Sequence, residues 1–418
     1  MDEKDCIEGL DVTLGVSKRF IIAKLQTAFH TSAIPTRIIG KRLDEGTGYL
    51  SLIASLRIEW PSNAGPNVQN RVILKIPTVE KVNEEFNNLN TGVDQDEIND
   101  MMLSFIELAH NQEVTAYEII GASKTPHILI PRVFLSERRC TSNSNIAGIL
   151  IMQDFSDTAC LAEFADGLNY SQVTQILDEI AKLQAFSIVN ESKWHGRITA
   201  MGSEDSLKEL NAVLAAALAK LQSEFELCTE VTEETLLADV CNVNTWWFYT
   251  NPSPKQLFYR VLVHGDLWSN NCLFEKSTVD SDANFKAGDK LLTVLDWQCV
   301  HAGSYAEDIA RLLASSVTAE FRRKHATDLL NRFYHKLTEE LKQSYEEEVG
   351  DKSASRIPPF GVEQLHEEYK NISGYVAGFM LSQFSVMVDG EKYKNNDTAR
   401  HEIANRAAAN ILDHLATR

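Results

Sequence analysis

Two stretches, HGDLWSNN at residues 264–271 and LLTVLDWQ at residues 291–298, decide the fold and the chemistry of this chain. In each stretch, polar residues follow a short apolar run, which is typical of a buried strand that ends in a loop. Asp266, Asn271 and Asp296 would be costly to bury beside such strands unless their oxygens had partners. Carboxylate and amide oxygens are the ligands that Mg²⁺ takes in proteins, so the pattern favours a divalent-cation site.

The spacing of these residues matches a phosphoryl-transfer site. In kinase-type enzymes a catalytic-loop Asp accepts the proton of the attacking hydroxyl, and an Asn five positions later and an Asp after the next strand hold the metal ions. Asp266, Asn271 and Asp296 follow that order, and His264 precedes the candidate base by two residues. The presence of all four residues together disfavours the alternative, an ordinary strand-loop-strand with polar turn residues.

Two departures from the protein-kinase pattern favour a small-molecule kinase. Trp268 stands where a protein kinase usually carries a Lys after the base, and DWQ stands where it has DFG. No APE-like segment follows Asp296. Among the enzyme classes considered, a protein kinase is therefore the least favoured.

Length and composition limit the class of protein. The chain has 418 residues, enough for one large two-lobed unit or two domains, and its 44% hydrophobic and 24% charged content is ordinary for a soluble enzyme. The net charge of −19 argues against a nucleic-acid partner, because phosphate backbones require clustered Lys and Arg.

Cysteine usage and hydropathy predict a cytoplasmic protein. The seven cysteines are scattered without a CxxC pair, so neither a disulfide framework nor a zinc site is indicated, and reduced thiols are expected. The acidic stretch 1–12 lacks the apolar region of a signal peptide. No apolar run approaches the length of a membrane span, so no membrane partner is expected.

The N-terminal part of the chain holds candidate nucleotide-binding residues. The segment 41–60 predicts a strand-turn-strand in which Gly46 and Gly48 could let backbone N–H groups cover phosphates, although a plain hairpin has the same pattern. Lys75 interrupts the apolar strand RVILKIP at 71–77. Such a Lys either faces solvent or binds a phosphate.

A helix is predicted over residues 96–120, because apolar residues recur there at helical spacing. It carries Glu113, and a strand Lys paired with a helix Glu is the arrangement that orients nucleotide phosphates in kinases. Glu107 and Glu118 lie on the same helix and are alternative partners for Lys75.

The order of elements predicts an α+β, protein-kinase-like two-lobed fold. Residues 1–155 are expected to form a small, mainly antiparallel β lobe with one long helix, and residues 156–418 a larger helical lobe that contains the catalytic hairpin. Asp308 begins a helix after this hairpin. Its carboxylate would either complement the helix dipole or support the catalytic loop from behind.

The motifs HGDLWSNN, LDWQ and YAEDIARLL, together with LKIP and HNQEVTAYE, resemble those of the CHK kinase-like family. That family includes the ecdysteroid kinase-like proteins of insects and a large nematode group, and it belongs to the choline kinase and aminoglycoside phosphotransferase superfamily. The resemblance covers about residues 40–390. HNQEV and the spacing of AEDIARLL are closer to the nematode group.

The resemblance implies roles in the C-terminal lobe. Asp266 would be the catalytic base, with His264 shaping its loop, and Asn271 and Asp296 would be Mg²⁺ ligands.

The resemblance also implies roles in the N-terminal lobe. Lys75 would hold the phosphates of ATP, and Glu113 would orient Lys75. The turn EGTGYLS, which contains Gly46 and Gly48, departs from the family pattern because it lacks a full glycine triad.

The function predicted on these grounds is ATP- and Mg²⁺-dependent phosphorylation of a hydroxyl on a small molecule. A steroid alcohol, a choline-like alcohol and a xenobiotic conjugate all fit as acceptors. Two alternatives remain open. One is a catalytically inactive kinase-like protein that binds a nucleotide or another small molecule, and the other is a metal-dependent hydrolase that uses Asp266 and Asp296 without Lys75.

Overall fold

The computed structural model forms two compact units. The first comprises Met1–Tyr117 and Pro131–Asp157, and the second comprises Glu118–Ile130 and Thr158–Arg418. The structure describes residues 6–10, 17–43, 50–78, 95–123, 127–140, 147–199, 204–250, 259–278, 285–346 and 357–417.

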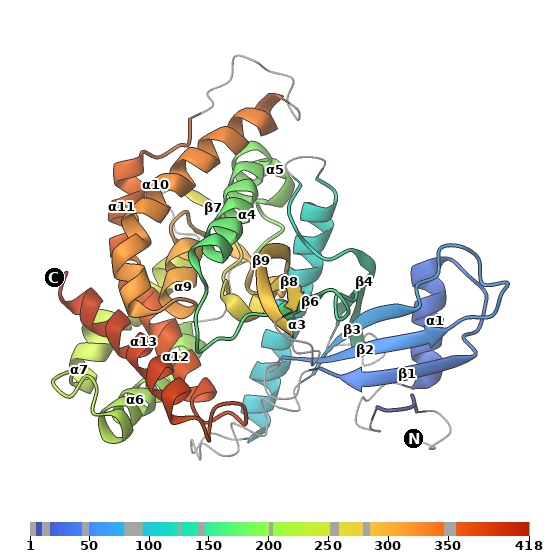
Figure 1. Cartoon of the computed structure of the whole chain (residues 1–418), viewed down its shortest axis with the longest axis horizontal. Coiled ribbons are helices and arrows are strands. Elements are labelled where there is room, and N and C mark those ends of the chain that lie inside the picture. The colour runs from blue at the N-terminus through green and yellow to red at the C-terminus, as the bar shows by residue number, and fades with distance from the viewer. Residues whose placement is uncertain are drawn as a thin grey trace. The chain divides into compact units, whose positions relative to one another are not determined.

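The first unit is built on a five-stranded antiparallel sheet (Figure 1). Burial alternates along β1 and most of β2, as expected for strands with one face on a core. In order across the sheet, the strands are β1 (Arg37–Arg42), β2 (Ser51–Glu59), β3 (Arg71–Pro77), β5 (Ala147–Gln153) and β4 (Val133–Arg139).

Helix α1 (Lys18–Phe29) closes the core of this sheet. Ser17 caps the helix by accepting a hydrogen bond from the N–H of Phe20 at 3.1 Å. Ile21, Leu25 and Phe29 recur on one side of the helix and are buried with the sheet residues.

Helix α3 (Gln95–Gly121) corresponds to the helix predicted over residues 96–120. Of the apolar residues at the predicted helical spacing, Ala109, Tyr117 and Ile120 are buried. Phe105 and Leu108 are only partly buried.

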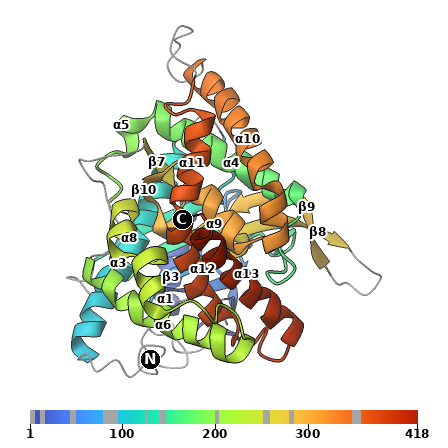
Figure 2. The same cartoon turned by 90° about the vertical axis from the view of Figure 1, so that its left-hand side faces the viewer.

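The second unit contains two small antiparallel sheets among helices (Figures 1 and 2). One sheet has the order β6-β8-β9 and the other pairs β10 with β7. The strands are β6 (Ala159–Leu161), β7 (Arg260–Val263), β8 (Cys272–Thr278), β9 (Phe285–Val294) and β10 (His301–Ser304).

The helices of this unit supply most of its core. They are α4 (Tyr170–Val189), α5 (Glu191–Trp194), α6 (Glu204–Phe225), α7 (Glu233–Thr235), α8 (Val243–Thr250), α9 (Glu307–Ser315), α10 (Ala319–Ser344), α11 (Val362–Asn371), α12 (Ser373–Met387) and α13 (Asp397–Leu415). The α+β fold class predicted from the sequence is confirmed, with an antiparallel sheet and one long helix in the N-terminal part and many helices after it. In the part of the chain that the structure describes, no helix is both long and apolar enough to cross a bilayer.

Helix α9 is the buried centre of the second unit. All nine of its residues are buried, and α4, α10, α12 and α13 pack around it (Figure 2). The last carbonyls of a helix lack partners within the helix, so they need donors from elsewhere. Asn410 Nδ2 of α13 donates to the carbonyl of Ala314 at 2.9 Å, and Arg406 Nη1 donates to that of Ser315 at 2.8 Å.

Arg406 joins α9 to the segment that follows β6. Its guanidinium also donates to the carbonyls of Phe164 at 3.0 Å and Ala165 at 3.1 Å, and its side chain is fully buried. Removal of the guanidinium would leave three carbonyl oxygens without this donor, two of them in buried hydrogen bonds, and buried oxygens are costly to leave unsatisfied.

We predict that Arg406→Met lowers the free energy of unfolding by about 3 kcal/mol, because it deletes a buried charge that several acceptors share. The measurement is the urea midpoint of the second unit, followed by tryptophan fluorescence. Arg323→Met is the matched control: Arg323 is 56% exposed and pairs with Asp413, so its loss should cost less than about 1 kcal/mol. Equal midpoints for the two variants would contradict the role assigned to Arg406.

Candidate active site

The strand pairings bring the two stretches that decide the fold into contact. Loop 264–271 connects β7 to β8, while Val263 lies opposite His301 and Cys272 lies opposite Val294. The N–H of Leu295 donates to the carbonyl of Asn271 at 2.8 Å. Asp296 therefore comes directly after Leu295, which this hydrogen bond fixes to the last residue of the loop.

His264 ties the loop to the end of β9. Its Nδ1 accepts the N–H of Asp266 at 3.3 Å, so Nε2 carries the proton and donates to the carbonyl of Leu295 at 2.8 Å. The buried imidazole also lies 4.7 Å, centroid to centroid, from the ring of Trp297. Through these contacts, His264 holds the shape of the loop.

Gly265 lets the loop pass close to the chain before β10. Its φ is +77°, a conformation that residues with a side chain rarely adopt. A Cβ atom at this position would lie 2.1 Å from the carbonyl oxygen of Cys299. Glycine is therefore required at the second position of HGD.

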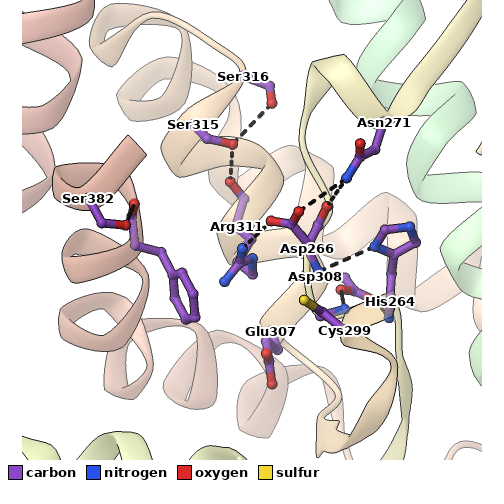
Figure 3. Close-up of polar contacts among 12 residues, drawn as sticks. His264, Asp266, Asn271, Cys299, Glu307, Asp308, Arg311, Ser315, Ser316 and Ser382 are labelled. Carbon is purple, nitrogen blue, oxygen red and sulfur yellow. Dashed lines mark hydrogen bonds and ion pairs between the residues drawn. The ribbon is translucent and has the colours of Figure 1, made fainter. Parts of the chain in front are cut away.

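Asp308 supports the loop from the first turn of α9 (Figure 3). Its Oδ2 accepts the N–H of His264 at 2.8 Å, and its Oδ1 accepts the N–H of Gly265 at 3.0 Å. Burial raises the pKa of this carboxyl. Of the two sequence-based interpretations of Asp308, support of the loop at 264–271 is the one that the hydrogen bonds show.

Both carboxylate oxygens of Asp266 have a donor (Figure 3). Asn271 Nδ2 donates to Oδ2 at 3.3 Å and to the Asp266 carbonyl at 2.8 Å, and Arg311 Nη2 donates to Oδ1 at 2.6 Å. The carboxylate is thus fixed in orientation. Its side chain is 21% exposed, so another molecule can reach it.

Asp296 occupies a strained backbone position between β9 and β10. Its φ and ψ are both 63°, in the left-handed region, which costs a residue with a side chain on the order of 1 kcal/mol. Strain of this kind concentrates at functional sites, because the surrounding structure must enforce it.

The donor set of Asn271 and Asp296 fits Mg²⁺. One or two protein side chains and the phosphates of a nucleotide are its usual ligands, and an amide oxygen and a carboxylate are both hard donors. Within the described ranges there is no group of three or more His, Cys, Asp and Glu side chains that could hold a metal ion by themselves.

In the first unit, Lys75 pairs with Glu113. Lys75 lies on β3, opposite Ile53 of β2 and Leu150 of β5, and its Nζ is 2.7 Å from Glu113 Oε2. The two side chains are only 4% and 1% exposed. Among the three glutamates considered from the sequence, Glu113 is therefore a partner of Lys75, while Glu118 pairs with Arg197. Gly46 and Gly48 lie outside the described residues.

His110 lies one helical turn before Glu113 and remains neutral. Burial lowers the pKa of this imidazole to about 4, and its Nε2 lies 2.8 Å from the carbonyl oxygen of Glu137. A neutral His110 adds no positive charge next to Lys75 at physiological pH.

Comparison with known proteins places the chain in a family. The model of the DUF1679 family, described as "Uncharacterized oxidoreductase dhs-27", matches residues 21–417. The chain belongs to this family. The resemblance to the nematode group of kinase-like proteins is confirmed by the family and by the relatives that follow.

Two relatives come from Caenorhabditis elegans. "Uncharacterized kinase-like protein D1044.1" is 24% identical over 90% of this chain and 88% of its own length. "Uncharacterized oxidoreductase dhs-27" is 22% identical over 69% of this chain, and the chain spans about a third (34%) of that relative's length.

Solved structures with a similar arrangement include two phosphotransferases. Choline kinase from Cryptosporidium parvum has a TM-score of 0.45 at 10% identity, with 91% of this chain and 88% of that chain covered. The GDP complex of aminoglycoside 2'-phosphotransferase-IIIa has a TM-score of 0.43 at 10% identity, with 94% and 99% covered.

Two residues of this DUF1679 chain that position the loop were not found from its sequence. Arg311 binds Asp266, and Ser316 Oγ accepts the N–H of Ser269 at 2.8 Å. The sequence offered one signal: Arg311 follows Asp308 by three residues, so the two side chains lie on the same side of a helix.

We predict that Asp308→Asn lowers the free energy of unfolding by about 2 kcal/mol. The amide keeps the size of the side chain but has one acceptor oxygen, so at least one of the two loop N–H groups would face an NH₂ donor. The measurement is chemical denaturation beside Asp289→Asn, a control at an exposed position that should change stability by less than about 0.5 kcal/mol. An Asp308→Asn variant as stable as this control would contradict the loop-support role.

Proposed function

We propose that this protein is an ATP- and Mg²⁺-dependent kinase that transfers the γ-phosphoryl group of ATP to an alcohol hydroxyl of a small molecule. The observation that carries the proposal is the placement of Asp266 and Asn271 on a loop that is bonded to the residue preceding Asp296. Along the chain, the candidate base Asp266, the amide of Asn271 and the carboxylate of Asp296 follow the same order as the corresponding groups of phosphoryl-transfer sites. The kinase-like relative, which matches 90% of this chain, supports the same class of activity.

In the proposed reaction, Asp266 orients the acceptor hydroxyl and accepts its proton. The hydroxyl oxygen forms a bond to the γ-phosphorus, the bond from that phosphorus to the β–γ bridging oxygen breaks, and ADP leaves with the electron pair. Asn271 and Asp296 would hold Mg²⁺, whose charge would offset the negative charge on the β- and γ-phosphates. The contribution of the protein is positioning and electrostatics rather than covalent chemistry.

Lys75 would bind the α- and β-phosphates of ATP. Its buried ion pair with Glu113 supports this role, because the carboxylate holds the ammonium in one place within the sheet. A buried ion pair often adds little to the stability of the fold, because removing both charges from water is costly. A role in binding phosphates would explain this pair better than a contribution to stability.

The test is transfer of ³²P from Mg·[γ-³²P]ATP to a panel of alcohols that includes steroid alcohols, choline, ethanolamine and vicinal diols. Asp266→Ala should lower kcat by about 10³-fold, within the range for loss of a general base, and should leave the Kd for Mg·ATP nearly unchanged. Glu275→Ala, which removes an exposed carboxylate from β8, is the control and should keep wild-type turnover.

Each contrary outcome has a separate meaning. Wild-type turnover by Asp266→Ala would disprove the assignment of the base. Binding of Mg·ATP without transfer to any member of the panel would favour the inactive binding protein. Release of inorganic phosphate without transfer to any alcohol, at an equal rate in Lys75→Met, would favour a metal-dependent hydrolase, because such an enzyme has no need of that ammonium.

A further inference from the structure

The motif HNQEV at residues 110–114 attaches helix α3 to the edge of the five-stranded sheet. Besides Glu113, it carries His110 and Asn111, and both of these side chains bind backbone atoms of β4. Strand β4 lies at one end of the sheet, so backbone groups along its outer edge need partners from outside the sheet. The helix that carries Glu113 supplies such partners.

Asn111 binds Arg139 as another backbone amide would. Its Nδ2 donates to the carbonyl of Arg139 at 3.0 Å, and its Oδ1 accepts the N–H of the same residue at 2.9 Å. This pair of bonds needs a side-chain amide, because only such a group offers a donor and an acceptor side by side as a peptide does. Two bonds to one residue fix the position of α3 along β4 as well as its distance from the strand.

His110 adds a buried contact one residue earlier. Its Nε2 donates to the carbonyl of Glu137 at 2.8 Å. Gly148 on β5 leaves the space for this ring: its φ is +75°, and a Cβ atom there would lie 2.8 Å from His110 Nε2. The sheet is therefore shaped to receive this histidine.

The strand pairings place these contacts in line with Lys75. Leu150 of β5 lies opposite Lys75 of β3 on one side and opposite Ser136 of β4 on the other. The side chains from α3 bind β4 one and three residues beyond Ser136. One sheet thus carries both Lys75 and the attachment of the helix whose Glu113 lies 2.7 Å from its ammonium.

We propose that Asn111 is a positioning residue of the nucleotide site, and that together with His110 it holds α3 at the register in which Glu113 meets Lys75. The proposal rests on the kinase function proposed above, which gives that ion pair its role. A helix rises about 1.5 Å and turns about 100° per residue, so a slip of one residue would direct Glu113 away from β3. In protein kinases the position of the corresponding helix controls whether the pair forms. Here the bonds to β4 hold it formed.

The acetylation rate of Lys75 tests this positioning without any ligand. The full chain is treated with acetic anhydride, and the rate at each lysine is measured by mass spectrometry of its peptides. Only the free amine reacts, and loss of a neighbouring carboxylate lowers the pKa of an ammonium by about one or more. Glu113→Ala sets the rate for a Lys75 without this partner. Asn111→Ala should raise the rate at least about tenfold above wild type, toward the rate of Glu113→Ala.

Two controls separate positioning from a general loss of stability. Lys24→Met removes an ion pair of 2.6 Å between α1 and Glu137, so it takes a contact from the same strand and leaves α3 in place. Lys75 should then react at the wild-type rate. In the Asn111 variants, Lys24 should in turn keep its wild-type rate, because α1 is attached to β4 independently of α3.

Asn111→Asp provides a second variant of the same size. Its carboxylate keeps an acceptor for the N–H of Arg139 but has no donor for the Arg139 carbonyl. The cost to the packing is smaller than with alanine, and the acetylation rate of Lys75 should still rise.

The Kd for Mg·ATP connects the position of α3 with the proposed function. Asn111→Ala should weaken binding by about tenfold, the effect of one hydrogen bond to a charged donor. In a chain that already carries Lys75→Met, the same change should alter the Kd by less than about twofold, because the effect passes through Lys75. Lys24→Met should leave the Kd unchanged.

Several results would overturn the proposal: a wild-type acetylation rate of Lys75 in both Asn111 variants, an equal rise at Lys24 and Lys75, or the same rise in Lys24→Met. An equal loss of Mg·ATP affinity with and without Lys75 would also overturn it. Acetylation as predicted, without binding of Mg·ATP to wild type, would contradict the kinase function alone. Binding of Mg·ATP with unchanged acetylation would contradict the role of Asn111 alone.

Discussion

The carboxylate of Asp308, buried and bonded to two consecutive backbone N–H groups, is the constraint on which the candidate active site depends. It fixes His264 and Gly265 to the first turn of α9, and α9 lies at the centre of the second unit. The same helix carries Arg311 to Asp266, and its last carbonyls are bonded by α13. The C-terminal helix thereby contributes to the geometry of a loop more than a hundred residues earlier in the chain.

Two ion pairs join candidate functional residues: Lys75–Glu113, in which both side chains are buried, and Arg311–Asp266, in which the arginine is buried and the carboxylate is partly exposed. Exposed pairs such as Lys290–Glu275 contribute little to stability, because water and salt screen them. Buried pairs carry a desolvation cost that their attraction often fails to offset, so well-packed apolar residues would serve stability as well. The kinase function proposed above would give both pairs a role, Lys75 in the binding of phosphates and Arg311 in the positioning of the base.

The sequence predicted those features that local pattern encodes. Apolar runs that end in polar residues located the ends of β7 and β9, and helical spacing located α3. Arg311 could not be assigned in this way, because a charged residue on a helix does not reveal a partner 45 residues away. Asp308 was predicted in part: a carboxylate in the first turn of a helix suits the dipole whether or not a loop lies behind it.

Binding of Mg·ATP is the most direct test of the account, because a kinase must hold the nucleotide through the metal. The measurement is a thermal-shift titration of wild type and Asp296→Ala with ATP, in the presence and absence of Mg²⁺. A ligand that binds the native state raises the melting temperature as its concentration passes the dissociation constant. The account predicts a Mg²⁺-dependent rise in wild type that is lost in Asp296→Ala. No rise in wild type, or an equal rise in both proteins, would contradict it.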